Sequence, residues 1–497
     1  MDSQNQQQQQ PAEYFHIIVI GAGLSGINTG YRIQSELPEC NYTILEGRHT
    51  MGGTWDLFRY PGVRSDSDLH TFGFSWRPWL GEKTIAGGEL IRTYLRECAE
   101  AEGIDKKIRY RHKVISANWS STEQLWNLDV DTESQTVKYQ ARFVIFCTGY
   151  YNYKEPLASD IPGLENFKGT LIRPQFWPED MDYTGKKIVI IGSGATAVTL
   201  VPNLAKKASH VTMLQRSPTY ILASPANDRV YALLRRLLPV RLAARITRIK
   251  FLVLPFCFFQ FCRFFPGVAK SLMRAVSKAQ LPSNVSVDPH FSPRYNPWEQ
   301  RLCLSPDGDI YSALGNGTAS VVTDTIKTVT ATGIQTTGGK SLDADIIVLA
   351  TGLKLQLAGG ASINVDEKPV DIPSKYLWRG AMMQDIPNAA FIIGYTNAAW
   401  TLGADSTTLL LCRLFKQFNL KETTVVPRMS TDEAAQMKNF PILNLSSTYI
   451  QKANGILPKS GNKAPWLAKQ NYFMDSWVGQ WSDLRKGLQV FKSTKAN

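Results

Sequence analysis

The sequence predicts an α/β fold with two Rossmann-like dinucleotide-binding domains and a helical insert, because one local pattern occurs twice. In each copy a short apolar run leads directly into a turn of small residues and then into a helix-compatible stretch. The two apolar runs are Phe15 to Ile20 and Ile188 to Ile191. The chain has 497 residues, of which 43% are hydrophobic and 20% charged, so it is long enough for about three units with large cores.

The first turn has glycine at three positions, and each glycine meets a separate need. Gly21 makes the tight turn, Gly23 lets the backbone approach a pyrophosphate, and Gly26 lets the helix pack on the strand. A second strand, Tyr42 to Leu45, ends at Glu46, 20 residues beyond Gly26, where a carboxylate accepts hydrogen bonds from a ribose diol. Strand, spacing and acid together predict a dinucleotide site, and the contrast between this acidic site and the basic second one assigns FAD to the first turn.

The second turn has alanine in the third small position and is followed by a strand over Val211 to Leu214. That strand ends at neutral Gln215, and the next residue is an arginine, which suits the 2′-phosphate of NADP better than a bare diol. We therefore predict that NADPH binds here. The expected contacts are Gly192, Ser193, Gly194, Ala195, Thr196, Ala197, Val198, Arg216 and Ser217.

We expect the two domains to alternate along the chain. The FAD-binding domain is expected over 12–160 and 353–497, the NADP-binding domain over 161–224 and 316–352, the helical insert over 225–315, and a disordered Gln-rich tail over 1–11. Two apolar runs end in Thr-Gly, at Thr148-Gly149 and Thr351-Gly352, and these pairs either mark the crossings between the domains or are simply tight turns. A helix-like stretch over Leu402 to Phe418 either points its positive end at the flavin ring or is simply capped.

The stretch between the two turns carries a longer signature. It contains a glycine pair at Gly52-Gly53, then Trp55, Tyr60-Pro61-Gly62 and Asp66. This arrangement resembles the second signature of the Baeyer–Villiger monooxygenases, a family of class B flavoprotein monooxygenases. Nearly the whole chain is similar in motif order to one branch, the mycobacterial ethionamide-activating monooxygenases. The motifs that carry this similarity are Asp66-Ser67-Asp68, Trp177-Pro178-Glu179-Asp180 and Tyr295-Asn296-Pro297-Trp298.

One position departs from the family fingerprint F-x-G-x-x-x-H-x-x-x-W. Phe167, Gly169 and Trp177 match it, but Arg173 occupies the histidine position. Imidazole both donates and accepts a hydrogen bond, whereas guanidinium stays charged and only donates. We therefore expect any step in which this side chain accepts a bond or relays a proton to differ from the family. Trp177 favours the Baeyer–Villiger group over the sister flavin N- and S-oxygenases.

The resemblance implies that NADPH reduces FAD, that oxygen adds to give a flavin C4a-peroxide, and that this peroxide attacks a hydrophobic ketone to give an ester or lactone. Sulfide oxidation is the implied secondary activity. Arg301 matches the family arginine that stabilises the developing negative charge, and Asp66 matches the aspartate that positions it. Arg64, Ser65 and Asp66 are expected on the nicotinamide side. Further implied flavin contacts are Ser25, Thr54, Trp55, Asp56, Leu57 and the backbone of Val114.

Cysteine usage excludes one related class of flavoproteins. Disulfide reductases need a redox cysteine pair soon after the flavin ribose acid, but this chain has Trp55 there and contains no C-x-x-C. Molecular oxygen is then the obvious acceptor for electrons from a reduced flavin. A flavin N- or S-oxygenase, an NADPH oxidase that releases peroxide, and a non-catalytic redox sensor remain as alternatives.

The net charge of +13 suits polyphosphates, acidic membrane surfaces or nucleic acid. Residues 229–265 place arginines among leucines and aromatic residues, which predicts either a wall of the substrate cavity or a contact with a membrane surface. Nucleic-acid binding is not expected, because no recognition module is present. The apolar run Phe251 to Cys262 is too short to span a bilayer.

The polar segment Met1 to Pro11 lacks a signal-peptide pattern, and an odd count of seven cysteines fits no secreted disulfide framework. We therefore expect a cytoplasmic protein with reduced thiols, with membrane association as the open alternative. No metal site is expected, because the six histidines stand singly. The pattern predicts no particular oligomeric state.

Overall fold

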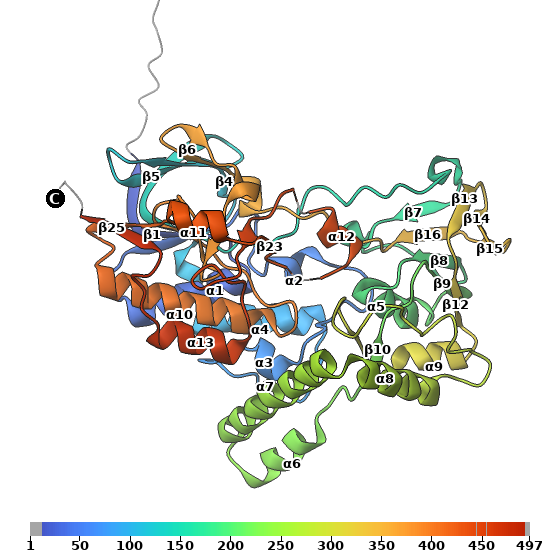
Figure 1. The fold of residues 1–497 in the computed structure, drawn as a ribbon. Coiled ribbons are helices and arrows are strands. Elements are labelled where there is room, and N and C mark those ends of the chain that lie inside the picture. The colour runs from blue at the N-terminus through green and yellow to red at the C-terminus, as the bar shows by residue number, and fades with distance from the viewer. Residues whose placement is uncertain (1–11, 444, 454, 493–497) are drawn as a thin grey trace, which may run out of the picture.

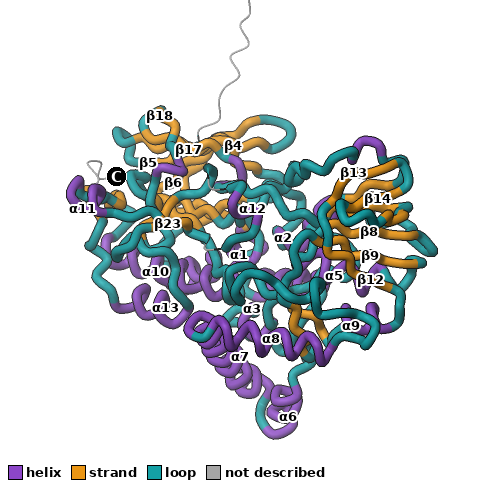
Figure 2. The backbone as a smooth tube through the Cα atoms, turned by 45° about the vertical axis from the view of Figure 1, so that its right-hand side comes forward, coloured by secondary structure: helices purple, strands orange, loops and turns teal. Residues whose placement is uncertain are grey.

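The computed structural model describes residues 12–443, 445–453 and 455–492. The predicted Gln-rich tail over 1–11 lies outside these residues. Two sheets with helices around them form the body of the molecule, and a group of helices from the insert lies along its lower side (Figures 1 and 2). The predicted α/β fold class is thus confirmed by two separate sheet layers with helical cover.

The larger sheet is built around β1 (Glu13–Ile20), which pairs in parallel with β2 (Tyr42–Leu45) and β6 (Thr136–Phe146). The last four residues of β1 are buried, as expected for a central parallel strand covered on both faces. The strand order is β18-β17-β4-β5-β6-β1-β2-β3, with β21 also paired to β6. The remaining strands are β3 (Ile108–Arg109), β4 (Lys113–Ser120), β5 (Leu125–Asp131), β17 (Ser362–Val365), β18 (Lys368–Pro369) and β21 (Ala389–Phe391).

The second sheet is parallel throughout and has the order β12-β9-β8-β16-β7. Its strands are β7 (Thr170–Ile172), β8 (Lys187–Ile191), β9 (His210–Gln215), β12 (Ala319–Thr323) and β16 (Ile346–Leu349). β8 and β9 confirm the two strands predicted around the second turn, each with small extensions at the ends. A three-stranded antiparallel sheet lies beside it in Figure 1 and consists of β13 (Ile326–Thr330), β14 (Gly333–Thr336) and β15 (Ser341–Asp343).

The two sheets repeat one steric arrangement at their glycine turns. β6 lies beside β1 and ends just before Cys147-Thr148-Gly149, while β16 lies beside β8 and ends just before Ala350-Thr351-Gly352. Gly21 and Gly192 have φ angles of +102° and +135°. A Cβ on Gly21 would lie 2.8 Å from the Cys147 carbonyl oxygen, and one on Gly192 would collide with the Ala350 carbonyl oxygen. Glycine is therefore required because the end of the neighbouring strand packs on each turn.

Helices cover the larger sheet on the side seen below it in Figure 1. α10 (Trp400–Phe418) packs against both α1 (Leu24–Glu36) and α13 (Tyr472–Trp481). α10 begins two residues before the predicted start at Leu402. The other helices near this sheet are α2 (Thr54–Leu57), α3 (Leu69–Phe72), α4 (Gly88–Ala101), α11 (Thr431–Gln436) and α12 (Thr448–Gln451). α5 (Ala195–Leu204) and α9 (Asp309–Gly315) pack together beside the second sheet.

Short two-stranded pairings complete the described structure. They are β10 (Ile221–Ser224) with β11 (Cys303–Pro306), β19 (Leu377–Trp378) with β20 (Met382–Met383), β22 (Thr423–Pro427) with β25 (Leu488–Lys492), and β23 (Phe440–Pro441) with β24 (Lys459–Ser460). All seven cysteines carry free thiols.

The insert consists of α6 (Arg229–Leu237), α7 (Val240–Phe264) and α8 (Pro266–Gln280). A buried arginine on α7 fastens it to the body: Arg248 donates to the carbonyl oxygens of His70 and Gly73 at 2.7 Å each, at the end of α3. Among the described helices, none is by itself both long and apolar enough to cross a membrane. The pair α7 and α8 meets those criteria only when taken together, across a bend of 117°.

Candidate active site

An elongated cavity of about 570 Å³ runs along the first glycine turn, from Glu46 at the end of β2 to Trp400 at the start of α10. It brings together most of the residues predicted from the sequence to contact the flavin. Those that line it are Gly21, Gly23, Ser25, Glu46, Thr54, Trp55, Leu57, Ser65, Asp66, Val114 and Arg301.

Glu46 closes one end of this cavity with a carboxylate that is only 7% exposed. Its two oxygens accept hydrogen bonds from the backbone N–H groups of Ala22, at 2.6 Å, and Arg48, at 2.9 Å. Burial raises the pKa of Glu46 above its usual value. The acid is therefore held firmly at the turn, where its remaining lone pairs fit the hydroxyl groups of a ribose.

The opposite end of the cavity is aromatic. Tyr150 stacks on Trp400 with ring centroids 5.0 Å apart, and the Trp400 indole N–H donates to the Ser25 hydroxyl at 3.0 Å. An elongated space with a buried acid at one end, aromatic rings at the other and a glycine turn along its side fits FAD. Sequence reasoning missed Tyr150 and Trp400. The only local signal was that tyrosine follows the first Thr-Gly pair directly.

Of the predicted cofactor contacts that precede the second turn in sequence, three do not line this cavity. Gly26 packs against the Gly21 carbonyl, where any side chain would collide, so it serves helix packing. Asp56 accepts hydrogen bonds from Arg48 at 2.6 Å and Arg59 at 2.7 Å. Arg64 forms an ion pair with Asp309 on α9. Asp56 and Arg64 thus hold neighbouring loops in place, and Asp56 does so through Arg48, which does line the cavity.

Arg301 and Asp66 form an ion pair at one side of this first, elongated cavity, called the flavin cavity below. The Arg301 Nη1 donates to the Asp66 Oδ2 at 2.6 Å, although the two residues are 235 positions apart. Their side chains are 32% and 30% exposed, and the negative charge of Asp66 raises the pKa of Arg301 above its usual value. Among the described residues, Asp66 is the only hydrogen-bond partner of the Arg301 guanidinium. Its remaining N–H donors are available to a ligand.

A second cavity of about 400 Å³ meets the first at this ion pair, because Asp66, Ser67 and Arg301 line both. The other walls are mostly apolar; α7 contributes more of them than any other helix or strand, and α13 adds Tyr472 and Phe473. They include Phe251, Phe256, Phe258, Leu302, Leu402 and Phe473. The insert therefore does form a wall of this cavity, which was one of the two interpretations of its sequence. Asp68 is an acidic exception in the wall, and burial raises its pKa to about 6.

The second glycine turn leaves room in front of its middle glycine. No atom lies within 4 Å of the position that a Gly194 Cβ would occupy, and α5 begins at the next residue. The Ser193 hydroxyl donates to the Ser217 carbonyl oxygen at 2.9 Å, which brings the turn and the end of β9 together. Arg216 is exposed next to them and donates to Thr448 at 3.3 Å. This cradle, which a Cβ would fill, fits the pyrophosphate and 2′-phosphate of NADP.

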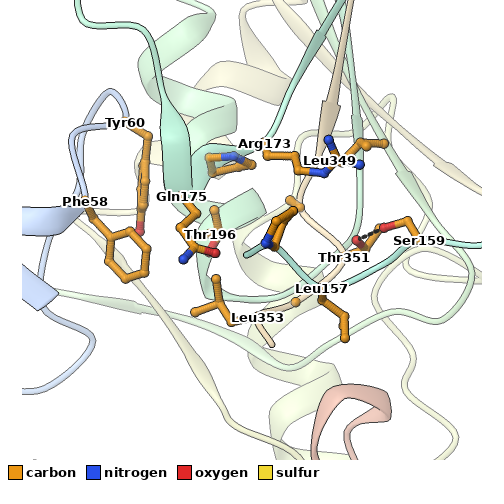
Figure 3. A pocket seen from close by; sticks show the side chains of 14 residues that line it. Phe58, Tyr60, Leu157, Ser159, Arg173, Gln175, Thr196, Leu349, Thr351 and Leu353 are labelled. Atoms are coloured by element: carbon orange, nitrogen blue, oxygen red, sulfur yellow. Dashed lines mark hydrogen bonds between the residues drawn. The ribbon is translucent and has the colours of Figure 1, made fainter. Parts of the chain in front are cut away.

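Arg173 lines a third, small cavity of about 40 Å³ together with Tyr60, Gln175 and Thr196 (Figure 3). It lies just after β7 in the second sheet, and its side chain is exposed without a hydrogen-bond partner among the described residues. Trp177 is buried in the core of that sheet. The position that departs from the family fingerprint therefore belongs to the cavity next to the second turn and not to the one that holds Arg301.

These features together are typical of a flavoprotein that uses a nicotinamide nucleotide. They are two glycine turns, an acid after the first, an arginine after the second, and an apolar cavity beside another arginine. Residues 86–250 match a family described as "Flavin-binding monooxygenase-like", and residues 19–81 match "NAD(P)-binding Rossmann-like domain".

Close relatives cover almost the whole chain. The FAD-containing monooxygenase EthA of Mycolicibacterium smegmatis is 45% identical over 464 residues, which are 93% of this chain and 94% of EthA. The probable FAD-binding monooxygenase AlmA of Acinetobacter baylyi is 43% identical over 466 residues, 93% of each chain. This chain therefore belongs to the family of FAD-containing monooxygenases. It is an FAD-dependent NADPH monooxygenase, which confirms the predicted resemblance and both predicted cofactors.

Solved structures share the fold at low sequence identity. An oxidised steroid monooxygenase bound to NADP has a TM-score of 0.74 at 18% identity and covers 97% of this chain and 100% of its own. An open structure of cyclohexanone monooxygenase has a TM-score of 0.74 at 20% identity with the same coverage.

The space in front of Gly194 leads to a prediction with a matched control in the same turn. Gly194→Ala is expected to leave the melting temperature unchanged, because its Cβ meets nothing, but to raise the Kd for NADP⁺ about tenfold or more by blocking the phosphates. Gly192→Ala is expected to lower the melting temperature as well, because of its positive φ and the Ala350 carbonyl. Thermal melts and titration calorimetry measure both. Unchanged NADP⁺ affinity in Gly194→Ala would contradict this placement of the phosphates.

Arg173→His tests the departure from the fingerprint. Because the side chain is exposed and unpaired, stability is expected to change by less than about 0.5 kcal/mol. Imidazole titrates near pH 6.5, whereas guanidinium stays charged, so kcat/KM for NADPH is expected to gain a pH dependence around that value in the variant only. Initial rates across the neutral pH range measure this. Identical pH profiles for the two proteins would show that this position takes no part in the cycle.

Proposed function

We propose that this monooxygenase catalyses Baeyer–Villiger oxidation: it inserts one oxygen atom of O2 next to the carbonyl of a hydrophobic ketone and yields an ester or lactone. Oxidation of sulfides is a secondary activity. The observation that carries this proposal is the Arg301–Asp66 ion pair at the place where the flavin cavity meets the apolar cavity. Bound FAD supplies the activation of oxygen, with electrons from NADPH.

The guanidinium of Arg301 is suited to stabilise an oxygen anion. Nucleophilic attack on a ketone carbonyl requires negative charge on the attacking oxygen and creates it on the carbonyl oxygen, and a fixed multi-donor cation favours both. Asp66 uses one of the Arg301 N–H groups and orients the others. Because Asp66 orients the guanidinium through this hydrogen bond, it acts as the positioning residue, and Arg301 is the group that contacts the reacting atoms.

The shape and chemistry of the second cavity support an apolar substrate. Phe251, Phe256 and Phe473 contribute aromatic walls, and apolar residues outnumber polar ones around the space beyond the ion pair. A ketone carbonyl would lie at the polar end, next to Arg301, with its hydrocarbon part among these rings. Two solved structures of similar fold carry cyclohexanone and ε-caprolactone, a ketone and a lactone.

We further propose that the residues lining the first cavity, from Gly21 to Arg301, contact FAD and that the second turn with Arg216 and Ser217 contacts NADPH. The predicted residues that lie outside the first cavity, Asp56 and Arg64, then act on the cofactors through the loops that they hold. The predicted cytoplasmic location belongs to the same proposal.

A panel of ketones and thioethers tests the reaction type with purified enzyme and NADPH. Ester or lactone product from an apolar ketone, with one product formed per NADPH consumed, supports the proposal. Sulfoxide without any ester would instead indicate an S-oxygenase. Release of hydrogen peroxide equal to NADPH consumption with every compound would indicate an oxidase.

Arg301→Ala is expected to lower kcat for the ketone by about 10² to 10³, because one oriented donor set is lost from the charged transition state. The reduction of bound FAD by NADPH under anaerobic conditions is expected to continue. Arg301→Lys keeps the charge without the forked donors, and its kcat for the ketone is expected to lie between those of the native protein and of Arg301→Ala. Asp66→Asn is expected to lower kcat with a smaller change in KM. Product formation and anaerobic stopped-flow spectra measure these effects, and native ketone turnover in Arg301→Ala would contradict the role of Arg301.

A further inference from the structure

Residues 229–280, which include all of α6, α7 and α8, carry charged side chains of one sign only. This segment contains eleven Lys and Arg residues and no Asp or Glu, while the net charge of the whole chain is +13. Five of its arginines are exposed and form no ion pair with any described residue: Arg229, Arg236, Arg241, Arg245 and Arg263. The insert therefore presents unneutralised positive charge on a part of the molecule that extends away from the body in both overall views (Figures 1 and 2).

The same helices expose an unusual amount of apolar surface. On α7, Leu242, Ile246, Ile249 and Val253 follow one another at helical spacing and are 39% to 60% exposed. The opposite side of α7 is buried: Ala243, Ala244, Thr247 and Arg248 pack on the body, and further along the helix Phe251 and Phe258 line the second cavity. Further exposed apolar side chains on α6 and α8 are Leu233, Leu237, Val268 and Leu272. The exposed apolar side of α7 therefore has no partner among the residues that the structure describes.

The second cavity reaches the surface next to this apolar face. Leu254 on α7 and Phe473 on α13 line the cavity and are also exposed, 58% and 42% respectively. Phe256 contacts Phe473 with ring centroids 5.3 Å apart, so the two helices meet at this point. Trp477 and Trp481 follow on α13 at four-residue steps and are largely exposed. Tryptophan is favoured where an apolar phase meets water.

We propose that α6, α7 and α8 dock on the surface of an anionic phospholipid bilayer, and that the second cavity opens toward that bilayer between α7 and α13. Exposed arginines bind lipid phosphates while the leucine and isoleucine side chains enter the acyl boundary. An apolar substrate dissolved in the bilayer then reaches Arg301 without crossing water. This last step rests on the proposed function, whereas docking does not.

Charge complementarity selects the bilayer over a second copy of the chain. Pairing two copies through this face would bring together two sets of five exposed arginines that form no ion pair with any described residue. A bilayer of anionic lipids satisfies both properties of the face, its positive charge and its aliphatic surface.

Flotation with vesicles tests the docking. The full chain, loaded with FAD, is mixed with vesicles of phosphatidylcholine alone or with added phosphatidylglycerol. The protein is expected to float with the anionic vesicles and to remain in solution with the neutral ones. Replacing Leu237 and Ile249 together by serine is expected to lower the partition coefficient about tenfold or more. The control replaces Leu90 and Ile115, exposed apolar residues on α4 and β4, by serine and is expected to float normally.

The charge is tested in the same way. Neutralising Arg236, Arg241 and Arg245 with glutamine is expected to abolish the preference for anionic vesicles, while neutralising the exposed Lys106, Lys138 and Lys327 is expected to preserve it. Melting temperature and flavin absorbance show that each variant is folded. Failure of the native protein to float, or equal loss in the control variants, would overturn the docking. So would a vesicle-free sedimentation experiment in which Leu237→Ser with Ile249→Ser dissociates a dimer.

Substrate entry is tested separately from docking and from the reaction type. A long-chain ketone dissolved in anionic vesicles is expected to be oxidised faster than the same ketone in neutral vesicles, and a short water-soluble ketone at equal rates in both. Equal rates for the long-chain ketone would overturn entry from the bilayer. Flotation without oxidation of any ketone would overturn the proposed function and leave the docking supported.

Discussion

The ion pair between Arg301 and Asp66 is the interaction on which the arrangement of both cavities depends. Its two residues come from loops far apart in sequence, and both side chains are partly exposed, so surrounding structure must hold them together. One such support is the ion pair between Arg64 and Asp309, which fastens the loop of Asp66 to α9 beside the second sheet. Arg301 lies two residues before β11, and its guanidinium is oriented by Asp66 from the loop that Arg64 fastens. The relative position of the two sheets therefore decides whether the cation faces the flavin cavity.

Features that depend on short stretches of chain could be predicted from the sequence. β1, β2, β8 and β9 lie where apolar runs and turns place them, because burial between helices requires apolar residues on both faces of a parallel strand. Glu46 lies in the flavin cavity because the length of the first helix and second strand fixes its position relative to the first turn. The family signature added Arg301 and Asp66, whose pairing spans 235 positions and carries no local signal.

Features that depend on tertiary packing could not be predicted. Tyr150 and Trp400 are separated by 250 positions in the sequence. They stack because the fold brings the loop after β6 next to the first residue of α10. Asp56 and Arg64 were expected at the cofactors on the strength of neighbouring motif residues, yet each is neutralised by a charged partner from another part of the fold. The sequence left two interpretations of the insert open, a wall of the substrate cavity and a contact with a membrane surface. The structure shows the cavity wall, and it also shows exposed apolar side chains on the outer side of α7, which only tertiary packing could reveal.

One helix, α7, both lines the second cavity and presents exposed apolar side chains to the exterior. This shared element couples two traits that could otherwise evolve independently. A bulkier or smaller residue at Phe251 or Phe256 reshapes the chamber and also shifts the helix that presents Leu242 and Ile249 outward. Among relatives, changes in the size of compound accepted would then be accompanied by changes in the outer surface of the same helix. Diversification of chemistry and of cellular placement would proceed through one 25-residue segment.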